Sequence, residues 1–350
     1  MDYCPHTDTD IREMLDAVGV SSVDDLFEPV PEALRRREPL DLPPARSELE
    51  LTRELGAIAV RNVDLSRVPS FLGGGIYDHF VPALIDHLVL RGEFLTAYTP
   101  YQAEASQGSL ATIFEFQSLI CELTGMEVAN ASMYDGASAA AEAVQLALSA
   151  HRGRTRVLVS AGLHPEAQRV LQTYRDGAAS HELDRLPLDA ELSLDAGAVA
   201  GAVTGEAVAE AVRAQGALLI VVADPVSLGL LEAPGAYGAD VVVGDCQALG
   251  CPPSYGGPFA GYFASRHEHV RRMPGRIVGT TTDGEGRRGF VLTFQTREQH
   301  IRRARATSNI CTNQALMALR ATIYLAAMGP AGFGELARRC FENASYLRER

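Results

Sequence analysis

Polar and aromatic side chains follow several expected buried strands, at the edge where open α/β sheets bind their ligands. Tyr134, Gly136 and Ser138 lie at the start of an alanine-rich helix, and the backbone N–H groups of such a turn can hold a phosphate. His164 follows another apolar run and has a ring that can lie against a planar cofactor. Asp224 ends a third run and offers a carboxylate of the kind that pairs with a pyridinium nitrogen. Together these residues resemble a binding frame for a phosphorylated pyridine ring.

This frame is typical of fold-type I pyridoxal phosphate (PLP) enzymes, yet the covalent anchor of the cofactor is absent. The 350 residues include no lysine, since all 31 basic residues are arginines. A guanidinium stays protonated and does not condense with an aldehyde. The anchoring lysine is expected within residues 244–258, and this stretch contains none. Two interpretations are open at this point: a PLP fold that has lost its cofactor, or another α/β protein that mimics the frame.

Other patterns give weaker indications. Residues 73–75 are three glycines before an apolar-periodic stretch, but no strand precedes them and no phosphate-loop lysine follows, which favours a packing turn. The six cysteines lack zinc-site spacing, as in reduced intracellular proteins. His267 and His269, which flank Glu268, are expected on the surface. The sequence therefore predicts no metal site.

The elements that must position these residues indicate an α/β fold with a mainly parallel sheet. Helices are expected over 110–124 and 137–150, and over 312–328 with a break at Gly329-Pro330. A helix from Ser47 to Val60, with a capping box of Ser47 and Glu50, belongs to an N-terminal arm. Continuous apolar runs suit strands covered on both faces, and they lie at 156–160, 217–223, 240–244 and 257–263.

Composition limits the class of protein. With 47% hydrophobic and 21% charged residues, the chain suits a globular protein with a sizeable core. Its formal net charge of −13 argues against nucleic acid or an anionic membrane as a partner. No apolar run is expected to be long enough to span a bilayer, and the first residues are polar and acidic. We therefore expect a cytoplasmic protein without a membrane partner.

Longer motifs make the chain similar to a known family. Residues 98–108 and 293–313 resemble the corresponding segments of glycine dehydrogenase (decarboxylating), the P-protein of the glycine cleavage system, in the N-terminal (alpha) subunit, subunit 1, of its two-subunit form. The resemblance covers nearly the whole chain and favours the PLP fold without its cofactor. Shorter similar segments are 71–79, 114–117, 121–126, 129–136 and 244–258.

The resemblance implies a fold-type I PLP-dependent transferase-like three-layer domain over 91–311. It also implies a helical N-terminal arm over 1–90 and, over 312–350, the start of a C-terminal small domain that is expected to continue beyond Arg350. In this family subunit 1 lacks PLP, and the homologous subunit 2 binds PLP through a lysine. The two subunits form an α2β2 heterotetramer.

The implied reaction decarboxylates glycine, releases CO2 and transfers the aminomethyl group to the lipoyl arm of H-protein. An alternative function is a non-catalytic scaffold or regulatory subunit that only stabilises subunit 2. Tyr134, Ser138, His164 and Asp224 then become remnants of a cofactor frame, and capping or packing is their favoured role.

The resemblance directs attention to a polar and aromatic loop that can reach the active site of the partner subunit, because loops on a rigid scaffold often carry function. Its candidate catalytic residues are Tyr98, Thr99, Tyr101, Gln102, Glu104, Ser106 and Gln107. A second candidate region is the positive cluster of Arg297, Arg302, Arg303 and Arg305. For this cluster an interface or anion-steering role and a solvated face with internal ion pairs both remain open.

Overall fold

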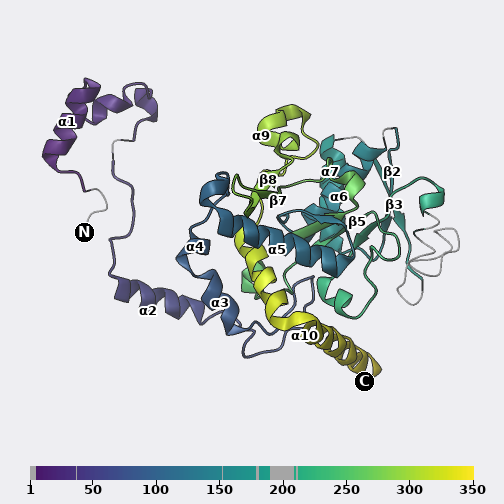
Figure 1. Cartoon of the computed structure of the whole chain (residues 1–350). Coiled ribbons are helices and arrows are strands. Elements are labelled where there is room, and N and C mark those ends of the chain that lie inside the picture. The colour runs from purple at the N-terminus through teal and green to yellow at the C-terminus, as the bar shows by residue number, and fades with distance from the viewer. Residues whose placement is uncertain (1–4, 37, 152, 179–180, 190–208, 210–211) are drawn as a thin grey trace. The chain divides into compact units, whose positions relative to one another are not determined.

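The computed structural model describes residues 5–36, 38–151, 153–178, 181–189, 209 and 212–350 (Figure 1). It divides into two compact units, Met1–Val68 and Pro69–Arg350. The three-part division with boundaries at 90 and 311 stays a prediction.

The first unit consists of short helices joined by extended segments. Two of its helices begin with capping boxes, Thr7 with Asp10 and Ser47 with Glu50, and the second of these confirms the sequence prediction. None of the described residues in this unit is buried. Its elements are α1 (Asp8–Val18), η1 (Asp24–Phe27), η2 (Glu32–Leu34) and α2 (Glu48–Ala59).

The second unit alternates helices with short strands. Its helices are α3 (Ala83–Val89), α4 (Gly92–Leu95), α5 (Gln107–Thr124), α6 (Gly136–Ala150), α7 (Pro165–Ala178), α9 (Gln299–Arg302) and α10 (Ala315–Glu349). Short 3₁₀ turns are η3 (Ala103–Ala105), η5 (Pro225–Gly229), η6 (Ser254–Gly256), η7 (His267–His269), η8 (Gln295–Arg297) and η9 (Arg303–Arg305). Its strands are β1 (Val128–Ala129), β2 (Arg156–Ser160), β3 (Glu182–Leu186), β4 (Ile220–Val222), β5 (Val241–Asp245), β6 (Gly261–Ser265), β7 (Ile277–Thr282) and β8 (Arg288–Thr293).

The described strands pair in three groups. A four-stranded sheet has the order β1-β6-β5-β4, with β4 and β5 parallel and the pairs β5–β6 and β1–β6 antiparallel. β2 and β3 form a parallel pair, and β7 and β8 form an antiparallel hairpin. Strand β2 has its predicted bounds, whereas β6 begins at Gly261, later than predicted.

Helices cover both faces of the four-stranded sheet (Figure 1). Alternate residues of β5 point to opposite faces, so Val241 and Val243 pack with the alanines of α6 while Val242 packs with α5 and α10. Small alanine side chains let α6 approach the sheet closely. This is the three-layer arrangement that the sequence predicted.

Helix α10 corrects the expectation about apolar runs. It is long and apolar enough, by length and composition, to cross a membrane. Its residues Ala318, Ala321 and Tyr324 are buried in the core with α5, and a buried core helix of a soluble protein gives the same signal. The predicted break is confirmed, since Gly329 has φ 61° and ψ 175° just before Pro330.

Candidate functional site

A cleft of about 1030 Å³ lies where β2, β4 and β5 end. Gly136, His164 and Asp224 line it together, so the structure brings these members of the predicted frame to one place. Tyr134 and Ser138 are not among the lining residues. The Tyr134 hydroxyl instead accepts a hydrogen bond from the backbone N–H of Cys311, 3.1 Å away.

Two carboxylates occupy the N-terminus of α6, where a phosphate would be held. Asp135 caps the helix and accepts a 2.7 Å hydrogen bond from the Ser138 N–H. Asp245 accepts 2.9 Å and 2.8 Å bonds from the N–H groups of Gly136 and Gln247. The positive end of the helix dipole is thus already neutralised, and a phosphate would meet like charge there. These residues do not fit a phosphate group.

Burial also changes the pKa of Asp245 in this region. It raises the pKa of Asp245, although the bonds from Gly136 and Gln247 act in the opposite direction and the negative charge of Asp135 adds to the rise. The approach is tight: a Cβ atom on Gly136 would lie 2.9 Å from the backbone nitrogen of Asp245. Only glycine therefore allows the end of β5 to close on the start of α6.

The amide of Gln247 lies in the stretch where the lysine anchor was expected. Its oxygen accepts from the Tyr77 N–H at 2.8 Å, and its nitrogen donates to the carbonyls of Tyr77 at 2.8 Å and Cys251 at 2.9 Å. Gln247 thereby fastens the glycine-rich turn to the end of β5. A Cβ atom on Gly75 would lie 3.5 Å from the His164 ring, so this turn approaches the imidazole. The geometry supports a packing role for the turn.

Asp224 performs the capping role that its sequence favoured. One of its carboxylate oxygens accepts a 2.9 Å hydrogen bond from the Val226 N–H at the start of η5. Its charge also reaches His79. Burial lowers the pKa of His79, and the carboxylates of Asp224 and Asp78 oppose that shift.

The predicted catalytic loop lies outside this cleft and leads into α5, whose first residue is Gln107. None of its described residues lines the cleft. Tyr98 and Tyr101 are 78% and 57% exposed. Gln102, Glu104 and Gln107 are exposed as well, whereas Thr99 and Ser106 are half-buried. The loop thus presents aromatic and polar groups to the outside of the described chain.

Gln107 has a structural contact that its loop position did not indicate. Its side-chain oxygen accepts from the Phe290 N–H at 2.9 Å, and its nitrogen donates to the carbonyls of Phe290 at 2.8 Å and Ala103 at 2.7 Å. The amide thus bonds both the N–H and the carbonyl of Phe290, as a residue of a neighbouring strand would, and joins the loop to β8. Gln107 therefore holds the base of the loop in place.

The sequence did not indicate Arg276, a buried residue that contacts Tyr101 of the loop. This arginine is only 2% exposed and lies just before β7. It donates hydrogen bonds to the hydroxyls of Tyr101 at 3.2 Å and Thr312 at 3.0 Å. Its guanidinium carbon lies 5.4 Å from the centre of the Tyr101 ring. Residues 273–278 show no polar periodicity that would have identified a buried arginine.

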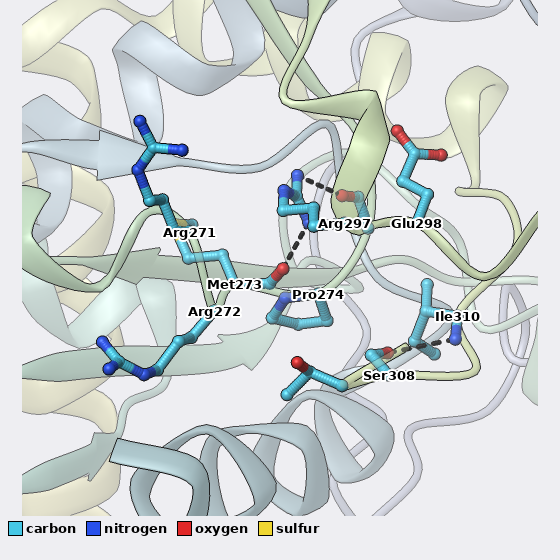
Figure 2. A pocket seen from close by; sticks show the side chains of 10 residues that line it. Arg271, Arg272, Met273, Pro274, Arg297, Glu298, Ser308 and Ile310 are labelled. Atoms are coloured by element: carbon cyan, nitrogen blue, oxygen red, sulfur yellow. Dashed lines mark hydrogen bonds between the residues drawn. The ribbon is translucent and has the colours of Figure 1, made fainter. Parts of the chain in front are cut away.

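The predicted arginine cluster is divided by the fold. Arg297 is partly buried and donates to the carbonyls of Met273 and, at 2.6 Å, Gly275 (Figure 2). Burial lowers its pKa to about 10, with Glu298 acting in the opposite direction. The other three arginines of the cluster, Arg302, Arg303 and Arg305, are exposed. An interface role for them stays a prediction.

Glu298 is buried beside Arg276, with 3.9 Å between its carboxylate and the guanidinium Nε. Burial raises its pKa, while Arg276, Arg297 and His300 lower it. Among the described residues, the arginine that forms an ion pair with Glu298 is therefore Arg276, which lies outside the cluster, and not an arginine of the cluster as expected.

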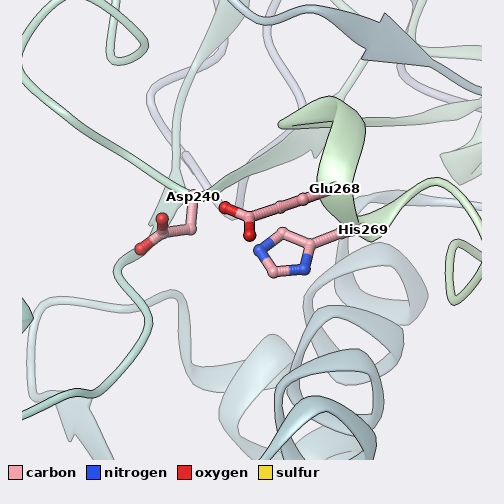
Figure 3. A group of neighbouring side chains, drawn as sticks. All are labelled: Asp240, Glu268 and His269. Carbon is pink, nitrogen blue, oxygen red and sulfur yellow. The ribbon is translucent and has the colours of Figure 1, made fainter.

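One group of side chains has the composition of a metal site. Asp240, Glu268 and His269 have ligand-type atoms within 4.8 Å of one another (Figure 3). His269 is 5% exposed, so the expectation that it lies on the surface is wrong: η7 turns its ring back onto the protein. Asp240 already accepts from the Leu219 N–H at 2.8 Å and lies 3.3 Å from the Arg266 guanidinium. Because that cation partly neutralises the group, the absence of a metal site stays our prediction.

The family model and the similar proteins of known sequence indicate the same family. Residues 1–350 match the family model described as "Glycine cleavage system P-protein". A relative in Carboxydothermus hydrogenoformans, named "Probable glycine dehydrogenase (decarboxylating) subunit 1", is 49% identical over 367 residues, which cover 100% of this chain and 82% of the relative. A protein of the same name in Geobacillus kaustophilus is 48% identical, with coverage of 99% and 81%.

Solved structures agree with these relatives. The crystal structure of an inhibitor-bound glycine decarboxylase (P-protein) of the glycine cleavage system superimposes with a TM-score of 0.86 and 48% identity, over 96% of this chain and 79% of that one. Mouse CSAD has a TM-score of 0.59 at 14% identity, over 94% and 72%, and shows likeness of fold alone. The predicted fold-type I PLP-dependent transferase-like α/β class is confirmed.

Proposed function

Since this chain belongs to the glycine cleavage system P-protein family and matches its subunit 1 members, we propose that it forms the cofactor-free half of a glycine decarboxylase. It has the P-protein role in glycine cleavage as a subunit of glycine dehydrogenase (decarboxylating). The alternative of a pure scaffold is not favoured.

The observation that carries the proposal is the state of the cofactor frame. No lysine exists in the sequence to form a covalent bond, and Asp135 and Asp245 take N–H groups that a phosphate needs. PLP is a cofactor of the fold-type I class, and in this proposal the lysine of subunit 2 holds it. PLP supplies the electron sink for loss of CO2 from glycine.

The contribution of this chain is the loop before α5. The side chains of Tyr98, Tyr101, Gln102 and Glu104 are exposed, and this exposure supports our proposal that they reach the active site of subunit 2 across the interface. Thr99, Ser106 and Gln107 shape the base of the loop. The side chains orient glycine and exclude water from the reacting carbon.

The proposed assembly is an α2β2 heterotetramer with subunit 2, and the lipoyl arm of H-protein accepts the aminomethyl group. The name "subunit 1" of the relatives supports a partner subunit. The chain is soluble, and with its net charge of −13 and free thiols among the described cysteines we place it in the cytoplasm.

A reconstitution experiment tests this function. The chain is purified alone and with subunit 2, each with excess PLP, and exchange of the glycine carboxyl carbon with CO2 is measured in the presence of H-protein. We expect exchange and a PLP absorbance band that survives gel filtration only in the complex. Glycine decarboxylation by the chain alone would refute the proposal.

A loop variant separates the proposal from the scaffold alternative. Tyr101→Phe removes one loop hydroxyl, and we expect about tenfold weaker exchange in an intact complex, since one hydrogen bond to a charged group is lost. The matched control is Tyr346→Phe, which changes an exposed tyrosine on α10. Unchanged exchange in both variants would support the scaffold.

A further inference from the structure

We propose that Arg276 is a positioning residue for the reaction: it holds Tyr101 so that the phenol proton points out of this subunit, toward an anionic oxygen of the amino-acid substrate in the partner's site. This inference rests on the proposed function of the loop and adds the residue that orients it, together with the substrate group that Tyr101 recognises.

The first support is the fixed position of Arg276. Its backbone carbonyl accepts a 2.8 Å hydrogen bond from the Ala131 N–H in the core. Its side chain, 2% exposed, donates to the Thr312 hydroxyl at 3.0 Å and lies 3.9 Å from the buried Glu298 carboxylate. The backbone of Arg276 is thus fixed in the core, and Thr312 and Glu298 contact its guanidinium from the body of the protein, so the guanidinium is a fixed support for its third contact, Tyr101.

The second support is the double contact with Tyr101. One guanidinium nitrogen donates to the phenol oxygen at 3.2 Å, and the guanidinium carbon lies 5.4 Å from the ring centre. The hydrogen bond directs the hydroxyl, and the cation–π contact holds the ring. Tyr101 is nonetheless 57% exposed, so its orientation needs such a support.

The third support is the polarity that this contact imposes. A guanidinium has donors and no acceptor, so the Tyr101 oxygen must accept and its own proton must point elsewhere. Among the described residues none accepts that proton. Arg276 therefore leaves the Tyr101 proton free to be donated to a group outside the described residues, and the bond from the cation strengthens the donor character of the hydroxyl. A carboxylate is the acceptor that such a donor favours.

Arg276 also unites two regions that the sequence treated separately. Glu298 belongs to the segment that carries the predicted arginine cluster, and Thr312 lies in the segment that leads into α10, which begins at Ala315. Both are joined through one guanidinium to the loop. Glu298 provides the negative charge that keeps the buried cation compensated.

A double-mutant cycle tests the inference in the complex of this chain with subunit 2 and H-protein. The variants are Tyr101→Phe, Arg276→Met and the double variant, and the measured quantities are KM for glycine and kcat of CO2 exchange. We expect each single variant to raise KM about tenfold with a smaller change in kcat, because substrate binding is lost. We expect the double variant to be no worse than the poorer single one, because both remove the same interaction.

Further variants keep the test decisive if Arg276→Met fails to assemble. Thr312→Val removes one anchor of the guanidinium, and Arg276→Lys keeps the charge without the planar fork. We expect both to raise KM severalfold in the wild-type background and to have no effect beside Tyr101→Phe. The matched control is Arg288→Met, since Arg288 lies over the rings of Phe114 and Phe290 and not over Tyr101. We expect its KM to be unchanged.

The outcomes distinguish a failure of the proposed function from a failure of the positioning role. If Tyr101→Phe has wild-type kinetics in an intact complex, the proposed function of the loop is wrong. If Tyr101→Phe is impaired and the losses from the Arg276 and Thr312 variants multiply with it, the loop is functional and the positioning role is wrong.

Discussion

Asp135, Asp245 and Gln247 replace, by internal contacts, the interactions that a cofactor would make in this frame. Their hydrogen bonds satisfy the N–H groups of α6 and hold the glycine-rich turn onto β5. Buried polar groups are costly when unpaired, so the contacts stabilise the fold without a ligand. At the scale of single residues, the cofactor frame of this chain therefore has a structural role: it connects α6, β5 and the glycine-rich turn.

Substitution of Gln247 tests this structural role. Gln247→Met keeps the side-chain length but removes the hydrogen bonds of the amide to the part-buried backbone groups of Tyr77 and to the buried carbonyl of Cys251. We expect unfolding free energy to fall by about 2–4 kcal/mol, to be measured by urea denaturation. Gln215→Met, at an exposed position, is the control and is expected to change stability by less than about 0.5 kcal/mol. Equal stability of both variants would contradict the structural role.

The buried histidines predict a pH dependence of stability. Burial lowers the pKa of His269, with Glu268 and Asp240 opposing and Arg272 and His151 adding to the shift. Because the folded state binds this proton less well than the unfolded state, its contribution is full above the ordinary histidine pKa of about 6.5 and is lost as pH falls through that value. We expect His269→Gln to lose less stability than the wild type between pH 7.5 and pH 5.5 by urea denaturation. The same loss in both proteins would contradict this sign.

At the scale of elements, helix α10 depends on the break in its middle. Its first part packs against α5 and α3, and beyond Gly329 its buried residues Phe333 and Ala337 turn toward η5. A straight helix would place these two residues on a different side. The backbone angles at Gly329 therefore decide whether both halves are buried.

Substitution of this glycine tests the break. Gly329 adopts φ 61° and ψ 175°, a region that is accessible almost only to glycine. We expect Gly329→Ala to destabilise the protein by about 1–3 kcal/mol in thermal or urea unfolding. Gly332→Ala is the control, because that glycine is helical and a Cβ there would meet only Met328 at 3.6 Å. We expect this control to be neutral or slightly stabilising, and a reversed order would argue against the break.

At the scale of the whole molecule, the described first unit has no buried residue of its own. Within this unit helix α2 leaves Leu51, Leu55 and Ile58 uncovered, and apolar side chains gathered on one short helix are typical of a contact surface. Because the relatives are named subunit 1, we propose that α2 contacts the partner subunit, subunit 2.

A charged residue on α2 tests this contact in the full chain. Leu55→Glu places a charge where an apolar contact is proposed, and we expect the affinity for subunit 2 to fall at least tenfold by titration calorimetry. Thr52→Glu adds the same charge at a polar position of the same helix, and we expect little change in affinity. A comparable loss in both variants would indicate general charge repulsion and not a contact of Leu55.

The sequence by itself determined the fold class and the loss of the covalent anchor, because both depend on local chemistry: apolar runs with strand and helix patterns, and the absence of any lysine amine. The roles of Ser47, Glu50 and Asp224 as caps follow from contacts with residues two or three positions away, and these were predicted.

Only the tertiary structure decided which groups replace the cofactor and which support the loop. Asp245 meets Gly136, Gln247 meets Tyr77, and Arg276 meets Tyr101 across separations of more than a hundred residues. Such contacts depend on how strands and helices pack, and a buried arginine such as Arg276 has no pattern along the chain. A single sequence records the residue types at these positions, but the physical pairing is set by the fold.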